Sequence, residues 1–245
     1  MKYSLNKIKK YFKSIKEKNL LFLVTAKKGI IGSFEKKYYS ESGEDVVLSR
    51  IFSKQEHGFY VDVGAYHPKQ YSNTYLLYKK GWKGINIDAN PDSIKIFKWS
   101  RPSDINLNLG ISNIRKEIPY YRYSNAGCNT FDEAQAKNLE NKDWISLIDK
   151  SNVSCFPLSE VLEKNIQNSN QEIDLLSVDI EGLDLEAIES NDWEKFRPKV
   201  IVIEGHGFDP NNPDEYKIHT FLKSKGYSLY AFTGLSLIYK KYSSI

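Results

Sequence analysis

At 245 residues, the chain is long enough for one α/β domain with a sizeable core and a short appendage. A content of 40% hydrophobic and 13% aromatic residues is typical of a globular protein and excludes an intrinsically disordered chain. The two cysteines, Cys128 and Cys155, give neither a disulfide framework nor a zinc-ligand spacing, so we expect free thiols in a reducing compartment.

The net charge of +4 is distributed unevenly along the chain. Residues 1–37 contain eleven lysines and two glutamates, a net charge of +9, so residues 38–245 carry −5. Proteins that act on nucleic acids usually present a basic face on the domain that reads them. The acidic body therefore disfavours a nucleic-acid partner.

Residues 1–37 predict a basic amphipathic helical arm. Apolar residues recur there with the 3, 4, 3 spacing of a helix face, at Leu5, Ile8, Phe12 and Ile15. The following apolar run, residues 20–24, is far shorter than the roughly 20 residues that span a bilayer. Two interpretations stay open: residues 1–28 lie on an anionic membrane surface, or they pack on the domain or on another subunit of a homo-oligomer. No small-residue cleavage site follows, so we expect a cytoplasmic protein, in the first case peripheral at the inner membrane surface.

The stretch from Gly58 to Asp92 predicts one βαβ unit. An apolar strand over residues 59–63 ends at Gly64, a helical segment follows over residues 72–78 and stops at Gly81, and a second strand ends at Asp88. Ligands of such sheets lie outside the carboxyl ends of the strands, where Gly64 and Asp88 are placed.

The turn after the first strand argues against a dinucleotide. It reads Gly64-Ala65-Tyr66-His67-Pro68-Lys69, with one glycine where G-x-G-x-x-G needs three, and proline has no amide to donate. A nucleoside ligand without phosphates fits better, and S-adenosylmethionine is one. Asp88 would then bind the ribose hydroxyls, and the Gly64 turn would admit the methionine part. Alternatively, Asp88 is an acid at the start of the helix that Asn90-Pro91 caps.

The remaining pattern predicts a doubly wound, Rossmann-like sheet of about seven strands with an antiparallel last strand. We expect further strands over residues 105–110, 116–123, 174–179, 200–204, 227–232 and 235–240. We expect helices from Asn90 through Trp99, from Pro157 with Ser159 as cap, over residues 183–190, and from Asn212-Pro213 to Gly226. Residues 124–150 read as an insertion beside the acceptor site, with a loop at 125–130 and mostly helix over 131–148.

Several short motifs, taken in their order along the chain, resemble those of the FkbM-type family of S-adenosylmethionine-dependent methyltransferases. The resemblance covers about residues 38–240 and rests on Ser42-Gly43-Glu44-Asp45, Tyr60-Val61-Asp62-Val63-Gly64-Ala65, Ser72-Asn73-Thr74-Tyr75, residues 81–88, Asn129-Thr130-Phe131, residues 176–184 and residues 197–204. It implies a class I methyltransferase domain over residues 38–245, with S-adenosylmethionine as the methyl donor and S-adenosylhomocysteine as the product. Glu41 departs from the glutamine expected there.

On this basis we expect the cofactor to be bound by Asp62, Gly64, Ala65, Asn73, Thr74, Asp88, Ala89, Asn108 and Asp179. Adenine would lie near the end of the third strand, between Asn108 and Ser112.

The catalytic candidates follow the fourth and fifth strands. Asp179 and Glu181, like Glu204 and His206, are spaced i, i+2, which puts each pair on one face of an extended backbone. An alcohol needs a base, and His206 titrates near neutrality, although Asp179 could be the base or orient the acceptor. The four side chains could also hold Mg²⁺, which the resemblance does not require, and we predict no metal ligand. His67 lies in the cofactor turn, and His57 and His219 are expected at the surface.

These features predict an O-methyltransferase for a sugar hydroxyl, with a nucleotide-activated or surface-polysaccharide sugar as the acceptor. Aromatic residues that could stack on sugar faces are Tyr120, Tyr121, Tyr123, Phe131 and Trp144. The alternatives are a phosphorus-linked or lipid-linked acceptor, or a non-catalytic assembly protein at a membrane surface.

Overall fold

The structure, a computed structural model, describes residues 10–11, 13–24, 37–168 and 170–242. The chain divides into two compact units, residues 1–37 and 38–245. In the first unit, residues 10–11 and 13–24 are helical, and residues 20–24 are exposed. Leu5, Ile8 and Phe12 of the predicted apolar face lie outside the described residues. In the part of the chain that is described, no helix is both long enough and apolar enough to cross a membrane.

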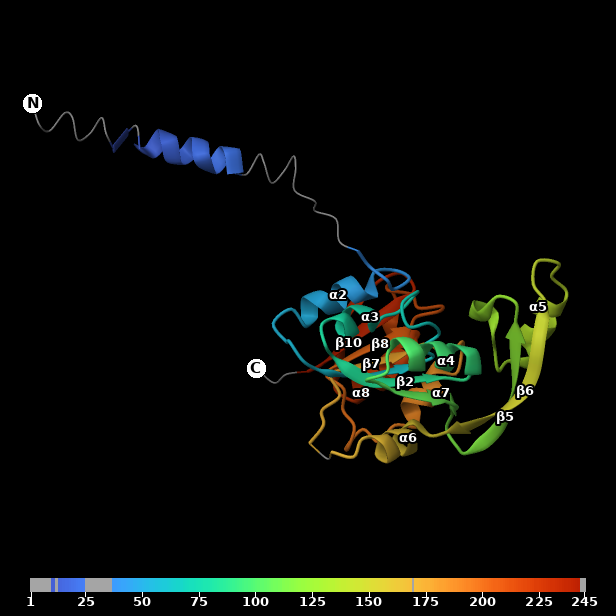
Figure 1. Ribbon diagram of the computed structural model, residues 1–245. Coiled ribbons are helices and arrows are strands. Elements are labelled where there is room, and N and C mark those ends of the chain that lie inside the picture. Colours follow the sequence, from blue (N-terminus) through green and yellow to red (C-terminus); the bar gives the residue numbers. More distant parts are fainter. Residues whose placement is uncertain (1–9, 12, 25–36, 169, 243–245) are drawn as a thin grey trace, which may run out of the picture. The chain divides into compact units, whose positions relative to one another are not determined.

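The second unit is built on a seven-stranded sheet in the order β3-β2-β1-β7-β8-β10-β9, counted over the described residues (Figure 1). β1, β2, β3, β7 and β8 are parallel, and β10 runs antiparallel to both β8 and β9. The bounds are β1 Phe59–Val63, β2 Lys83–Asp88, β3 Ile105–Asn108, β7 Leu175–Val178, β8 Val200–Glu204, β9 Tyr227–Phe232 and β10 Ser236–Lys241. The predicted doubly wound α/β sheet with an antiparallel last strand is confirmed.

Helices cover both faces of the sheet, so its parallel strands are apolar on both sides. Val61 and Val63 of β1 pack in a core with α6 Leu158–Asn165, α7 Asp184–Glu189 and α8 Lys217–Ser224. Tyr60 faces the other way, in a second core with α2 Glu44–Ile51 and α3 Tyr75–Lys79. Figure 1 shows α2 and α3 on one side of the sheet and α6 and α8 on the other.

The predicted insertion forms part of a second sheet, in the order β4-β6-β5, which extends to one side of the main sheet in Figure 1. It comprises β4 Gly110–Ile111, β5 Lys116–Tyr123 and β6 Leu147–Phe156, with η1 Ala126–Cys128 and α5 Glu133–Glu140 between the last two. The predicted helix over residues 131–148 is therefore too long. β6 lacks apolar alternation because it is mostly exposed, and its pairing with β5 holds it in place.

Three smaller expectations are also wrong. The predicted strand over residues 105–110 is split, because Gly110 joins Cys155 in the second sheet. Ser159 is not a cap: α6 begins at Leu158, whose amide donates to Ser190 Oγ at 2.9 Å. The helix after Asn212 is also shorter than predicted, because η2 Pro213–Glu215 precedes α8 and the extended Tyr216 separates them.

Candidate active site

A cavity of about 610 Å³ opens at the carboxyl ends of β1, β2, β7 and β8. The sheet order reverses between β1 and β7, and ligands of open α/β sheets bind at such a reversal. Residues 125–131, after β5, form another wall. The volume falls within the roughly 300–1,000 Å³ of small-molecule sites.

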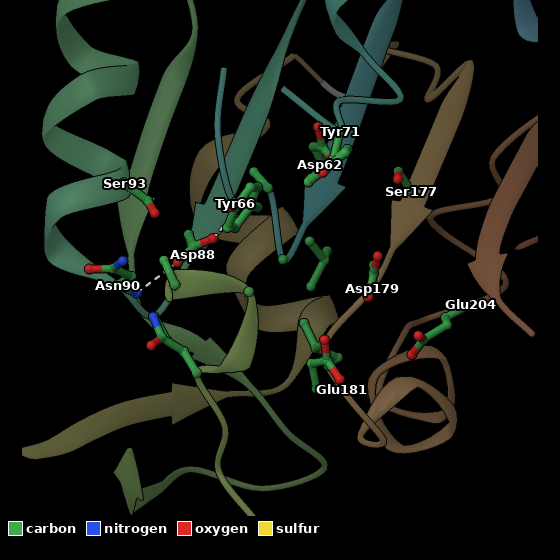
Figure 2. Close-up of a pocket in the computed structure, with 18 of the residues that line it drawn as sticks. Asp62, Tyr66, Tyr71, Asp88, Asn90, Ser93, Ser177, Asp179, Glu181 and Glu204 are labelled. Atoms are coloured by element: carbon green, nitrogen blue, oxygen red, sulfur yellow. Dashed lines mark hydrogen bonds between the residues drawn. The ribbon is translucent and has the colours of Figure 1, made fainter. Parts of the chain in front are cut away.

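Asp88 marks one end of the cavity, beside Asn90 and Ser93 (Figure 2). Its Oδ2 accepts from the Tyr66 amide at 2.7 Å, and its Oδ1 accepts from the Asn90 amide at 2.7 Å. Burial raises the pKa of this carboxyl to about 6. Each oxygen keeps a lone pair for a further hydroxyl donor. The side-chain cap of α4 Pro91–Ser100 is Asn90, whose Oδ1 accepts from the Asp92 amide at 3.0 Å.

Asp62 lies in the middle of the cavity, at the end of β1. Thr74 Oγ1 donates to Asp62 Oδ2 at 2.6 Å, and burial raises the pKa of Asp62. Asn73 lines the cavity and donates to Ser177 Oγ at 3.1 Å. Thr74 is fully buried behind Asp62 and does not line the cavity, so its predicted contact with the cofactor is wrong. It positions Asp62 instead.

Arg101 holds in place the part of the cavity wall around Asp62, and no sequence motif pointed to it. The side chain is fully buried and donates to Thr74 Oγ1 at 2.9 Å, to Ser72 Oγ at 3.0 Å and to the Pro68 carbonyl. One guanidinium thus ties the loop after β1 to the base of the cavity, because its planar fork serves several acceptors at once.

The other end of the cavity is acidic. Asp179 and Glu181 follow β7, while Glu204 closes β8 and His206 follows it. The Asp179 side chain is accessible from the cavity but enclosed by protein, and this desolvation, with Glu204 nearby, raises its pKa well above the usual range. The pKa of Glu204 is raised to about 7, mainly because burial desolvates the carboxyl and also because the negative charges of Asp184 and Glu181 lie nearby. His206 Nε2 lies 3.7 Å from Glu204 Oε1, and its side chain is 78% exposed.

These four side chains all line the cavity. Among the described residues, no three or more His, Cys, Asp or Glu side chains are grouped so that they could hold a metal ion.

The predicted site residues divide into those that line the cavity and those that do not. The lining ones are Asp62, Gly64, Ala65, Asn73, Asp88, Ala89, Asp179, Glu181, Glu204 and His206. Asn108 does not line it, because its amide donates to the carbonyls of Asp88 and Ala89 at 3.0 and 2.8 Å, while the neighbouring residues 109–111 do. His57 is exposed as predicted. His219, predicted at the surface, is buried, with Nδ1 3.1 Å from Tyr239 Oη.

Sequence reasoning missed several lining residues. They include Tyr66, Tyr71 and Ser93. Tyr66 and Tyr71 both have left-handed backbones, with φ of 53° and 54°, and their rings stack with centroids 6.1 Å apart. Non-glycine residues rarely adopt this conformation, so a sequence pattern gives little sign of it.

The sheet order and the cavity at its reversal fit the Rossmann-like fold of class I methyltransferases. The Methyltransferase FkbM domain matches residues 62–229, more than half of the chain, and the chain belongs to this family. Among solved structures, it is similar to a TehB-like SAM-dependent methyltransferase from Corynebacterium glutamicum ATCC 13032 Kitasato, with 13% identity and a TM-score of 0.42. That alignment covers 94% of this chain and 100% of the other. No curated protein matches the chain.

The residues present fit S-adenosylmethionine, the cofactor of this family. Asp88 offers two carboxylate oxygens to a ribose, and Leu109, Gly110 and Ile111 line the same end as a surface for adenine. Gly64, at φ 75°, has no side chain to block the turn. Asp62 and Asn73 also line the cavity and would offer polar groups to the methionine part.

Proposed function

We propose that this methyltransferase transfers a methyl group to a hydroxyl of a sugar. The observation that carries the proposal is the acidic end of the cavity, where Asp179, Glu204 and His206 face the same space as the cofactor residues. The ends of β2 and β7 are two strands apart, about 10 Å, so a nucleoside on Asp88 leaves room for an acceptor beside Asp179.

Methyl transfer to an alcohol needs alignment and a proton acceptor. When bound, S-adenosylmethionine supplies a methyl carbon made electrophilic by a positively charged sulfur. Glu204 is suited to take the hydroxyl proton, because its pKa of about 7 matches neutral conditions. His206, 3.7 Å from Glu204, is the second candidate base. Asp179 would orient the hydroxyl by accepting a hydrogen bond from it or from a neighbouring hydroxyl.

The lining supports a sugar as the acceptor. Carboxylate oxygens accept hydrogen bonds from hydroxyl groups, and aromatic rings cover the apolar face of a sugar ring. Tyr120 and Phe131 both line the cavity, with ring centroids 4.7 Å apart, but Phe131 lies against Gly110 at the adenine end, so the carboxylates at the other end carry the sugar assignment. Tyr121 and Tyr123, in contrast, pack in a small core with Ala136 and Ile145, and Trp144 is exposed.

The test is methyl transfer from isotope-labelled S-adenosylmethionine to a panel of free, nucleotide-activated and glycan-linked sugars. Mass spectrometry and NMR of the product would locate the label on a hydroxyl oxygen. A label found on a phosphoryl oxygen or on a lipid headgroup instead would contradict the sugar assignment and favour the alternative acceptors.

A further inference from the structure

Seven carboxyl groups line the cavity, and among the described lining residues His206 is the one basic side chain. Among the described residues, no lysine or arginine lines it, and His206 is the one lining side chain that becomes a cation on protonation. The seven carboxyl groups are Glu41, Glu44, Asp62, Asp88, Asp179, Glu181 and Glu204.

Two nearby arginines are already bound elsewhere. Arg101 is held by Pro68, Ser72 and Thr74 behind the wall. The guanidinium of Arg122 lies 3.2 Å from a carboxylate oxygen of Asp92 and 3.6 Å from a carboxylate oxygen of Asp149. Neither lines the cavity, so neither can hydrogen-bond a ligand there, although the Arg101 charge acts on Asp62, whose pKa burial nevertheless raises.

The carboxyl groups at the two ends of the cavity differ in their hydrogen-bond and ion-pair partners. Asp62 and Asp88 accept hydrogen bonds from the protein, and Glu44 accepts from Thr233 Oγ1 at 2.7 Å. In contrast, Asp179 and Glu181 have no side-chain hydrogen bond within the described residues. Among the described residues, the one ion-pair partner of the Glu204 carboxyl is His206, at 3.7 Å.

A bound cofactor removes only part of this imbalance. S-adenosylmethionine carries a net charge of about +1, from its ammonium and sulfonium against one carboxylate. The desolvated carboxyls of Asp179, Glu181 and Glu204 also repel one another, which keeps their pKa values raised. A second cation at this end would relieve that repulsion.

We propose that the acceptor carries a protonated amine beside its reacting hydroxyl, as an amino sugar does, and that the cavity rejects phosphate-bearing forms. This rests on the proposed function, which places the acceptor at the ends of β7 and β8. Carboxylates around an amine raise its pKa and keep it protonated. An ammonium has no lone pair, so the neighbouring hydroxyl oxygen would be the nucleophile. As its bond to the methyl carbon forms, the carbon–sulfur bond of S-adenosylmethionine would break, S-adenosylhomocysteine would leave with the electron pair, and the hydroxyl proton would pass to Glu204 or His206.

The test compares probes that share a ring and differ in one substituent, which is an amine, a hydroxyl or a phosphate. Binding of glucosamine, glucose and glucose 6-phosphate is measured to the full chain saturated with S-adenosylhomocysteine, and binding of cyclohexylamine, cyclohexanol and cyclohexyl phosphate is measured in the same way. We expect the amine of each set to bind about tenfold more tightly than its neutral partner and the phosphate to bind most weakly. Equal binding within each set, tighter binding of the phosphates, or no measurable binding of either amine would overturn the proposal.

Single-charge variants test whether the acidic end is responsible. Glu181→Gln and Glu204→Gln should each reduce the preference for the amine about threefold to tenfold, with little change in S-adenosylhomocysteine affinity. Glu189→Gln, an exposed position of α7 outside the cavity, is the matched control and should keep the parental preference. A parental preference in both pocket variants would also overturn the proposal.

The two proposals fail in different ways. If the amines bind preferentially but no sugar is methylated, the charge selectivity stands and the sugar assignment is wrong. If sugars are methylated and phosphate-bearing ones are the better substrates, the function stands and the charge proposal is wrong.

Discussion

Gly64 lies against the backbone of Asp179 so closely that a β-carbon on Gly64 would be 1.7 Å from the Asp179 carbonyl oxygen. The Asp179 amide also donates to the Val63 carbonyl at 3.0 Å. The turn that borders the cofactor and the residue that borders the acceptor are therefore held together by their backbones. The two halves of the site cannot be displaced independently.

Gly64→Ala should consequently destabilise the protein and weaken cofactor binding together. The methyl group has no room beside a backbone carbonyl, and the left-handed φ of 75° adds strain, so we expect a loss of about 3 kcal/mol or more in the free energy of unfolding. Denaturant unfolding and S-adenosylmethionine titration measure the two effects.

Gly81→Ala is the control, since Gly81 has a similar φ of 92° but nothing within 4 Å of an added β-carbon. It should lose only about 1–2 kcal/mol, the cost of the backbone conformation. Equal losses in the two variants would show that the contact with Asp179 is unimportant.

Asp179→Asn, Glu204→Gln and His206→Ala should lower turnover far more than they weaken S-adenosylmethionine binding. A base or an orienting group acts mainly in the transition state, so its removal should cost about 10²–10⁴ in rate. Single-turnover methyl transfer and equilibrium cofactor binding, measured on the same preparations, separate the two quantities.

The pH profile identifies the base. If Glu204 is the base, the parental rate should rise as the pH passes through about 7, because the carboxyl must be ionised to accept a proton. Glu204→Gln should then lose this limb, and His206→Ala should keep it. The reverse pattern would assign the base to His206, and near-parental turnover in either variant would exclude that residue from the chemistry.

The acidic end should also make folding stability depend on pH. The pKa of Glu204 is raised in the folded state, to about 7, so the folded protein binds more protons than the unfolded chain between about pH 4.5 and 7. The stabilisation of the folded state by Glu204 is therefore complete below about pH 4.5 and is lost as the pH rises through 7. Because the side chain is 17% exposed, we expect about 1–2 kcal/mol, less than the full shift implies.

Urea unfolding at pH 5 and pH 8 measures this dependence. Glu204→Gln cannot ionise and should flatten it, whereas Glu189→Gln should not. An equally steep loss of stability in Glu204→Gln would mean that other carboxyls of the cavity dominate.

The basic arm should contribute to surface binding and not to the chemistry. Every lining residue of the cavity lies beyond residue 40, so deletion of residues 1–28 should leave cofactor affinity near the parental value. Those residues contain nine lysines and one glutamate, so the remaining chain carries −4 and should bind anionic vesicles less. Vesicle sedimentation and cofactor titration test the two halves of this prediction, and a large loss of cofactor affinity would place the arm in the active domain.

The main sheet could be predicted from the sequence because each parallel strand is a short apolar run with a distinctive end. Gly64, Asp88 and Asp179 each follow or close such a run, and parallel strands bring those ends to one edge. The strands of the sheet and the side chains at their ends could therefore be predicted from the sequence, although their spatial order was not.

Other features depend on contacts between residues far apart in sequence. β6 is stabilised by its ladder with β5 and not by an apolar pattern. Arg101 is buried because Pro68, Ser72 and Thr74, about 30 residues earlier, supply its acceptors. His219 is buried against Tyr239, whose position follows from the pairing of the last two strands. None of these partners is visible in a local sequence window.

The central claim is that the cofactor is bound at the end of β2 by Asp88. The most direct test is the dissociation constant of S-adenosylmethionine for the parent and for Asp88→Ala, each shown to be folded by its unfolding transition. Asp92→Ala, a nearby carboxylate with a 59% exposed side chain outside the cavity, is the control. Losing charge-assisted hydrogen bonds to ribose should weaken binding at least about tenfold per contact in Asp88→Ala and leave Asp92→Ala near parental. Parental affinity should also fall as the pH drops below about 6, where Asp88 gains a proton. An unchanged affinity in a folded Asp88→Ala protein would contradict this account of the site.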